Sequence, residues 1–241
     1  MQEIEIRSGV IKPIECAKEA YELIKSEYWL LFAIWLVGAL IGGVTLFIAS
    51  GAMMCGTFYC YLRKIDGNSI TFDDLWKGTQ WFLPGLIVML IIIVPILIVY
   101  GMIYVPILMA AAMGTKLSPD EFMAMFVATL AIDLVFVVVM VCFHTLLLFS
   151  FPLIVDKDLG AFKAMTTSAR AVFKNLGGVG GLIGVNFLLG VAGYAAFCVG
   201  IYFVIPILIA TNVVAYRRIF PGGNTGRFDP PPPVVYGGGM P

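Results

Sequence analysis

Long apolar tracts alternate with short charged segments along this chain. The apolar tracts occupy residues 28–62, 82–113, 122–155 and 176–216. A helix needs about 20 residues to cross the hydrocarbon core of a bilayer, so the second and third tracts each predict one span. The fourth tract is about twice as long and predicts a hairpin of two spans that turns near residues 193–200. The first tract is too long for one span and barely long enough for two, so it predicts either a hairpin or one span with a short re-entrant segment.

The positions of the basic residues favour the hairpin in the first tract. If the first and last tracts are hairpins, every Lys and Arg except Lys116 lies on the same side of the membrane. Basic residues gather on the cytoplasmic side of membrane proteins. The chain is therefore predicted to be an all-α, polytopic membrane protein of about six transmembrane helices in three hairpins, with both termini in the cytoplasm. In the outer turn of the middle hairpin, Ser118 and Glu121 have the spacing of a capping box, which predicts a helix that begins there.

Each predicted hairpin follows a segment whose apolar residues recur every three or four positions. This spacing places them on one face of a helix, and such a helix is typical of the membrane interface. The alternative is a cytoplasmic loop with a helical bias. The three apolar faces are formed by Ile14, Ala17, Tyr21 and Ile24; by Phe72, Leu75, Trp76 and Thr79; and by Leu159, Phe162, Met165, Ala169 and Val172.

These features divide the chain into a cytoplasmic N-terminus with an amphipathic helix (1–27), a membrane domain (28–219) and a Gly- and Pro-rich cytoplasmic tail (220–241). Hydrophobic residues make up 61% of the chain and charged residues 12%. Soluble domains contain about 45–50% apolar and about 25% charged residues, so this composition excludes an ordinary soluble domain. The net charge of zero does not indicate nucleic-acid binding. The polar N-terminal sequence predicts no cleavable signal peptide.

The apolar tracts contain four notable polar residues: Asp133, His144, Asn186 and Asn212. Polar groups in hydrocarbon usually face a bundle interior, because their exposure to lipid is costly. Asp133 and His144 are eleven positions apart and share one helix face. Counting back about 20 residues from Pro152 places Asp133 near the outer edge of the core and His144 near its middle. Two roles remain open for His144: a hydrogen bond across the bundle to Asn186 or Asn212, or axial ligation of a haem or chlorophyll metal.

Small residues in the apolar tracts indicate helix packing. Glycines four positions apart allow two helices to approach closely, and this reading is favoured over a nucleotide loop because the tracts are apolar. The five cysteines are irregularly spaced and are predicted to be reduced and mostly buried in apolar surroundings. The glycines predicted to pack are Gly38, Gly42, Gly177, Gly180, Gly181 and Gly184.

Three motifs carry a resemblance to a known group of proteins. They are FDDLWKG (72–78), FPLIVDKDLG (151–160) and KAMTTSARAVFKN (163–175). With these motifs the chain resembles a broad bacterial family of uncharacterised six-helix integral membrane proteins, loosely akin to the membrane portion of some glycerophosphodiester phosphodiesterases. The resemblance implies a six-helix fold in a bacterial cytoplasmic (inner) membrane. It implies no catalytic residues, and no phosphodiesterase domain is expected in this sequence.

These observations lead us to expect a non-enzymatic accessory or scaffolding subunit of a larger membrane complex. A respiratory or photosynthetic complex would fit ligation by His144. One alternative is a carrier for a lipid or small apolar molecule, with Asp133 and His144 along its path. Another is a membrane-shaping or lipid-sensing protein that acts through its interfacial helices. The expected partners are membrane lipids, other subunits of the complex, and a protein that binds the proline-rich segment 229–241, from Asp229 to Pro241.

Overall fold

The computed structural model describes residues 5–114, 118–195 and 199–222, so the predicted tail-docking segment lies outside the described residues. The described residues form helices joined by loops, which confirms the all-α fold class. The elements are α1 (Pro13–Ile24), α2 (Tyr28–Val44), α3 (Ser50–Ile65), the 3₁₀ helix η1 (Phe72–Trp81), α4 (Phe82–Ala112), α5 (Pro119–Leu146), α6 (Ser150–Lys157), α7 (Ala161–Lys174), α8 (Leu176–Ala195) and α9 (Gly200–Ile219).

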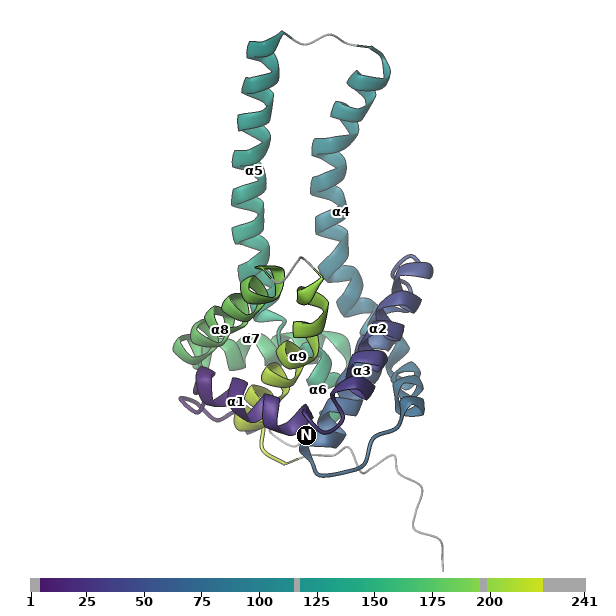
Figure 1. The fold of residues 1–241 in the computed structure, drawn as a ribbon, viewed down its shortest axis with the longest axis vertical. Helices are drawn as coiled ribbons and strands as arrows, with labels where there is room; N and C mark the ends of the chain where they lie inside the picture. Colours follow the sequence, from purple (N-terminus) through teal and green to yellow (C-terminus); the bar gives the residue numbers. More distant parts are fainter. Residues whose placement is uncertain (1–4, 115–117, 196–198, 223–241) are drawn as a thin grey trace, which may run out of the picture.

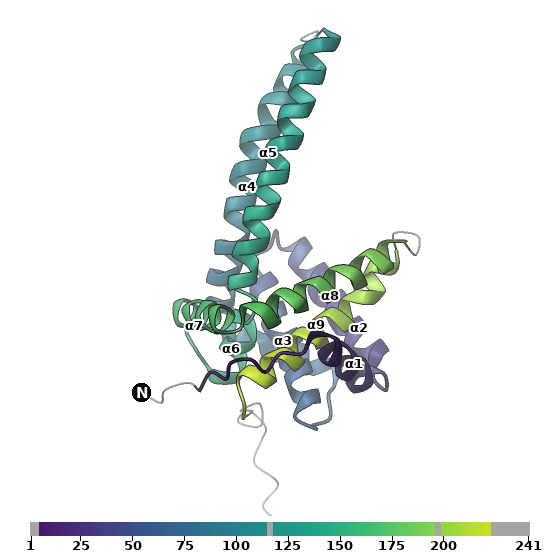
Figure 2. The same ribbon diagram turned by 90° about the vertical axis from the view of Figure 1, so that its left-hand side faces the viewer.

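Two long helices project from a compact body. Figure 1 and Figure 2 show α4 and α5 rising together from one end of this body, which the other helices form. α4 has 31 residues and α5 has 28. At 1.5 Å per residue, they are about 46 and about 42 Å long. The helix α5 begins at the predicted place, and the capping box between Ser118 and Glu121 is present.

Helix length separates these two helices from the first pair. α2 has 17 residues and α3 has 16, so each is only about 25 Å long. Among the described residues, four helical segments are long and apolar enough to cross a membrane, and α2 joins them only if it is counted with α1, from which it is bent by 98°. The structure is thus that of a helical membrane protein with four to five candidate spans. The four segments are Phe72–Met109, Pro119–Lys157, Leu176–Ala195 and Gly200–Ile219.

The core lies where α3, α6 and the end of α9 meet. Almost every residue of α3 is buried, and so are most of α6 and the second half of α9. The rings of Phe58 and Phe151 stack with their centroids 6.2 Å apart. Tyr61 and Tyr216 are fully buried. The helices α3, α6 and α9, which lie far apart along the chain, therefore share one core.

Glycines allow backbones to touch inside this core. A Cβ atom on Gly56 would lie 2.0 Å from the carbonyl oxygen of Leu75, and one on Gly78 would lie 2.1 Å from that of Ala52. Gly51 meets the backbone of Gly85 in the same way, at 2.2 Å. Any larger residue at these positions would push η1 or α4 away from α3.

The glycines chosen from the sequence divide into two groups. Gly38, Gly42 and Gly181 pack closely, with nearest distances from a built Cβ of 3.4, 2.4 and 2.6 Å to Met53, Ser50 and Pro13. A Cβ atom placed on any of the other three would lie more than 4 Å from the atoms of every other described helix or loop. The close helix contact expected at these glycines is therefore not made among the described residues. These three are Gly177, Gly180 and Gly184.

The second amphipathic segment differs from its prediction. Residues 72–81 form a 3₁₀ helix rather than an α-helix. Leu75 is buried, whereas the side chains of Phe72 and Trp76 are exposed. A 3₁₀ helix repeats every three residues, so an apolar face counted at three- and four-residue spacing does not stay on one side.

Candidate functional site

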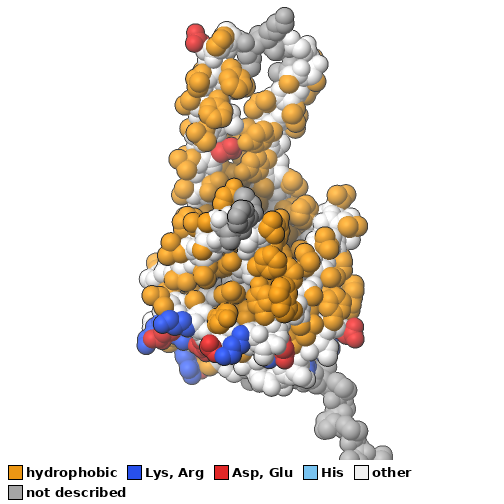
Figure 3. Space-filling model, in the orientation of Figure 1, with side chains coloured by type: hydrophobic (Ala, Val, Ile, Leu, Met, Phe, Trp, Pro, Cys, Tyr) orange, Lys and Arg blue, Asp and Glu red, His pale blue; other side chains and the backbone are white. Residues whose placement is uncertain are grey.

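Polar side chains gather at the end of the body away from the hairpin tip. Figure 3 shows Lys and Arg side chains at that end, whereas the visible side of the hairpin is mostly hydrophobic. This distribution matches a chain whose charged end faces the cytoplasm. All three sequence motifs contribute polar residues to this part of the body.

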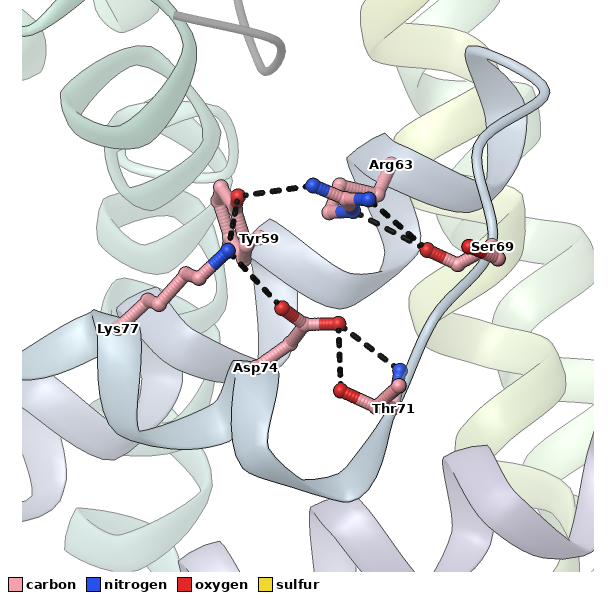
Figure 4. A network of polar contacts seen from close by, with 6 residues as sticks. All are labelled: Tyr59, Arg63, Ser69, Thr71, Asp74 and Lys77. Carbon is pink, nitrogen blue, oxygen red and sulfur yellow. Dashed lines mark hydrogen bonds and ion pairs between the residues drawn. The ribbon is translucent and has the colours of Figure 1, made fainter. Parts of the chain in front are cut away.

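The first motif, FDDLWKG, joins η1 to α3 (Figure 4). The hydroxyl of Tyr59 accepts hydrogen bonds from Lys77 Nζ at 3.2 Å and from Arg63 Nη1 at 3.3 Å. Lys77 also pairs with Asp74 at 3.2 Å. Asp74 accepts the backbone N–H of Thr71 at 2.8 Å and so completes the cap of η1. The motif residues therefore hold the 3₁₀ segment against the core.

The second motif, FPLIVDKDLG, supplies a buried carboxylate. The side chain of Asp156 is fully buried, and its Oδ2 accepts a 2.7 Å hydrogen bond from the hydroxyl of Tyr216. Its Oδ1 pairs with Arg217 at 2.8 Å. Arg217 also donates two hydrogen bonds to Asp66, at 3.0 and 2.7 Å. One arginine thereby joins the ends of α3, α6 and α9.

The third motif, KAMTTSARAVFKN, closes a break between two helices. The hydroxyl of Ser168 donates to the carbonyl of Leu146 at 2.7 Å, and it accepts the N–H of Phe149 at 3.0 Å. These backbone groups lie on either side of the break between α5 and α6. At the end of α7, Asn175 accepts the N–H of Gly9 at 2.8 Å and ties the N-terminal segment to the body.

A separate polar pair lies on the hairpin. The hydroxyl of Tyr104 on α4 donates a 3.0 Å hydrogen bond to Asp133 Oδ2 on α5. Close by, Tyr100 meets Phe136 edge to face, with 5.8 Å between the ring centroids. The other carboxylate oxygen, Asp133 Oδ1, is buried and has no hydrogen-bond partner among the described residues. Aromatic side chains of α4 thus link it to α5.

The depth expected for Asp133 and His144 changes with the structure. The count from Pro152 assumed one continuous helix, but α5 ends at Leu146 and α6 begins at Ser150. Asp133 therefore lies near the middle of α5, about 21 Å from its start, and His144 lies in its last turn, beside the body. The acid, rather than the histidine, is remote from the charged end.

The other polar residues of the apolar tracts form hydrogen bonds within or between helices. His144 Nδ1 lies 2.8 Å from the carbonyl of Met140, one turn earlier in its own helix, instead of bonding across the bundle. Asn186 donates a 3.0 Å hydrogen bond to Asn212, which joins α8 to α9. The two asparagines therefore form a polar bond across helices, whereas the structure shows His144 bonded within its own helix rather than to either of them. Sequence reasoning misses Tyr104 because its pairing depends on the register between two antiparallel helices.

A small apolar cleft lies between α2 and α3. Its volume is about 230 Å³, and its lining includes Trp35, Gly38, Phe47, Met53 and Met89. Sites for small molecules usually have about 300–1,000 Å³ and a few convergent polar groups. Three more open clefts have volumes of about 480, 510 and 560 Å³, so cleft volume alone does not decide against a carrier.

The chain matches no protein-family model, no curated protein and no solved structure. The resemblance carried by the three motifs therefore stays a prediction. What the structure adds is a physical role for those motifs, since their polar residues join helices to one another.

Proposed function

We propose that this chain is a non-enzymatic accessory or scaffolding subunit of a larger membrane assembly, and that its α4–α5 hairpin docks on the other subunits. One observation carries the proposal. The hairpin is bare apart from its base, yet it holds a carboxylate midway along its length. In each of its two helices, only 6% of the most apolar 18-residue stretch is buried against the rest of the chain.

The position of Asp133 makes lipid an unsuitable neighbour. An acidic residue at the centre of a membrane helix costs about 2.5–3.5 kcal/mol on insertion scales. Tyr104 satisfies one carboxylate oxygen. Lipid tails have no donor for the other oxygen, which is buried in the free chain, whereas a helix of another subunit that moves α4 from α5 on docking can supply one. Hydrogen bonds between membrane helices contribute about 0.6 kcal/mol on average and up to about 2 kcal/mol.

The charged end supports a structural role. Tyr59, Asp156 and Ser168 each connect two or more helices through hydrogen bonds. Such joints hold a body in one shape, which suits a scaffold. Association through the hairpin would then place this rigid end at a fixed position beneath a complex.

The sides of the membrane form part of the same proposal. Both chain ends are placed on the cytoplasmic side of a bacterial inner membrane, because all but one of the basic residues would then face the cytoplasm. This assignment holds for six crossings and for fewer, since a hairpin returns to the surface from which it starts. The arrangements differ in how deep the α2–α3 and α8–α9 turns lie.

The proposal is tested by native purification in mild detergent, with the protein mass measured by light scattering. We expect the wild type to elute with other subunits or copies, well above its own 26.2 kDa. The variant Asp133→Leu should lose most of this association, and Leu130→Ala, at an exposed position on the same helix, should retain it. A wild-type chain that elutes alone with bound lipid would contradict the proposal and favour the carrier.

A further inference from the structure

The two short hairpins do not reach as far as the long one. In Figure 1 and Figure 2, the far ends of α2, α8 and α9 lie near the level at which α4 and α5 leave the body, and α4 and α5 continue well beyond. A bilayer measures about 30 Å across its hydrocarbon and about 40–45 Å with its headgroups. The length of α4, about 46 Å, fits the second value. A slab placed on the body alone would leave the apolar upper parts of α4 and α5 in water.

The turn between α2 and α3 is apolar and exposed. Val44 is 85% exposed and Leu46 is 80% exposed. No charged residue occurs between Glu27 and Arg63. Leu46 and Phe47 adopt positive φ angles of 49° and 68°, which turns in water usually assign to Gly or Asn. By contrast, the turn at the hairpin tip contains Lys116, Ser118 and Asp120.

The backbone N–H groups of the α2–α3 turn are satisfied locally. The N–H groups of Thr45, Leu46, Phe47, Ile48 and Ser50 each donate to a carbonyl of residues 41–47. The remaining N–H, that of Ala49, donates to the hydroxyl of Thr45 at 3.1 Å. Hydrocarbon offers no hydrogen bonds, so backbone at membrane depth must find its partners inside the protein. The N–H groups of this turn meet that requirement.

The α8–α9 pair lies beside the surface helix α1. A Cβ on Gly181 would touch Pro13 at 2.6 Å, and Leu189 borders the same cleft as Lys18 and Glu22. α8 therefore follows α1 for much of its length. Lys18 and Glu22 are exposed charged residues, which hold α1 at the aqueous surface. A helix that runs along α1 does not cross the bilayer beside it.

The first turn of α9 lies beside the start of α2. The hydroxyl of Tyr28 donates a hydrogen bond to the carbonyl of Phe203, and Phe203 borders a cleft with Lys25. Tyr28 directly follows Glu27, which pairs with Lys64 at 2.9 Å. If α8 and α9 were full spans, Phe203 would lie on the side of the membrane opposite Lys25. Instead the two are neighbours.

From these contacts we infer that α2–α3 and α8–α9 are re-entrant hairpins that enter and leave the cytoplasmic leaflet, and that only α4–α5 crosses the membrane. The surface they present fits the acyl chains of that one leaflet. The far ends of α2, α8 and α9 lie near one level, so both hairpins reach a similar depth, no farther than the bilayer centre. This arrangement does not depend on the proposed function.

Single cysteines test the inference in intact cells. The parent protein has the exposed Cys142, together with Cys198, replaced by Ser, and it keeps the buried Cys16, Cys55 and Cys60. Burial raises the pKa of the Cys16 thiol, which makes it a poor nucleophile. An impermeant maleimide should label Asp120→Cys from outside and Lys163→Cys only after permeabilisation. Leu46→Cys and Val199→Cys should give no more outside labelling than the parent.

A depth measurement in proteoliposomes completes the test. A fluorophore attached at Leu46→Cys should be quenched most by lipids brominated near the ends of their chains. At Val199→Cys, the same lipids should quench most, because the far ends of α2, α8 and α9 lie near one level. Outside labelling at either position, without quenching, would overturn the inference in favour of six crossings. Protection of Asp120→Cys from the outside reagent would overturn the crossing of α4–α5.

Discussion

Ser168 on α7 accepts a 3.0 Å hydrogen bond from the backbone N–H of Phe149, a residue in the break between α5 and α6. The same hydroxyl donates to the carbonyl of Leu146 at 2.7 Å, and Ser168 is fully buried. One side chain thus replaces hydrogen bonds that a continuous helix would have made. The break turns α6 into the core while α5 continues into the hairpin.

Replacing Ser168 with Ala should therefore destabilise the fold. Two buried backbone groups would lose their partner, and each unsatisfied group costs about 1–3 kcal/mol. We expect a clear fall in the thermal unfolding midpoint of the purified protein. Thr166→Ala is the matched control, because the exposed hydroxyl of Thr166 bonds only within its own helix. Equal midpoints for the two variants would show that Ser168 does not support the break.

The buried carboxylate of Asp156 should matter more than an exposed one. Asp156→Ala leaves the mostly buried Arg217 with Asp66 as its described ion-pair partner. Because that pair remains, we expect a loss toward the lower end of the about 3–5 kcal/mol that breaking a buried pair costs. Glu19→Ala removes a 2.7 Å pair with Arg218 whose carboxylate is 53% exposed, and such pairs contribute about 0–1 kcal/mol. Chemical unfolding in detergent measures the difference. Comparable losses for the two variants would contradict the role of Asp156 as a joint.

Replacing glycine with alanine should have different effects on stability in the core and on the open face of α8. Gly56→Ala would place a methyl group 2.0 Å from the carbonyl oxygen of Leu75, so we expect poor folding and low yield. Gly180→Ala meets no described atom and lies inside α8, where Ala stabilises a helix by about 0.5–1 kcal/mol relative to Gly. Its unfolding midpoint should stay equal or rise. A folded Gly56→Ala protein with an unchanged midpoint would show that η1 does not need this close approach.

The sequence predicts the helices well but not the depth of every turn. Apolar length and the capping box at Ser118 place α5, and the charge-free stretch after Lys174 places α8 and α9. The count of basic residues is the same for a crossing hairpin and a re-entrant one, because both return to the side they leave. Only contacts such as that between Tyr28 and Phe203 distinguish them.

The candidate polar residues show the same limit. The sequence identifies Asp133 because an acid stands out in an apolar tract. Its partner Tyr104 depends on the register of α4 against α5, which no local pattern encodes. The close contacts of Gly51 and Gly56 likewise arise from helices that approach α3 from elsewhere in the chain.

His144 bonds within its own helix, so its replacement should be mild. A glutamine side chain can keep a polar contact near the carbonyl of Met140, and the His144→Gln protein should retain its unfolding midpoint. We expect its absorption spectrum to equal that of the wild type. A visible tetrapyrrole band in the wild type that disappears in His144→Gln would contradict this and establish ligation of haem or chlorophyll.

The re-entrant arrangement leads to a prediction about membrane shape. If α2–α3 and α8–α9 occupy only the cytoplasmic leaflet, the protein fills more area there than in the opposite leaflet, where only α4 and α5 are present. Shallow apolar insertion into one leaflet makes binding sensitive to curvature. Molecules with the charged end outward should therefore be denser in small vesicles than in large ones, as measured by fluorescence of single vesicles. Molecules inserted the other way, distinguished by outside labelling at Asp120→Cys instead of Lys163→Cys, should show the opposite preference. Equal densities in both orientations would mean that the two leaflets are filled alike, as six crossings require.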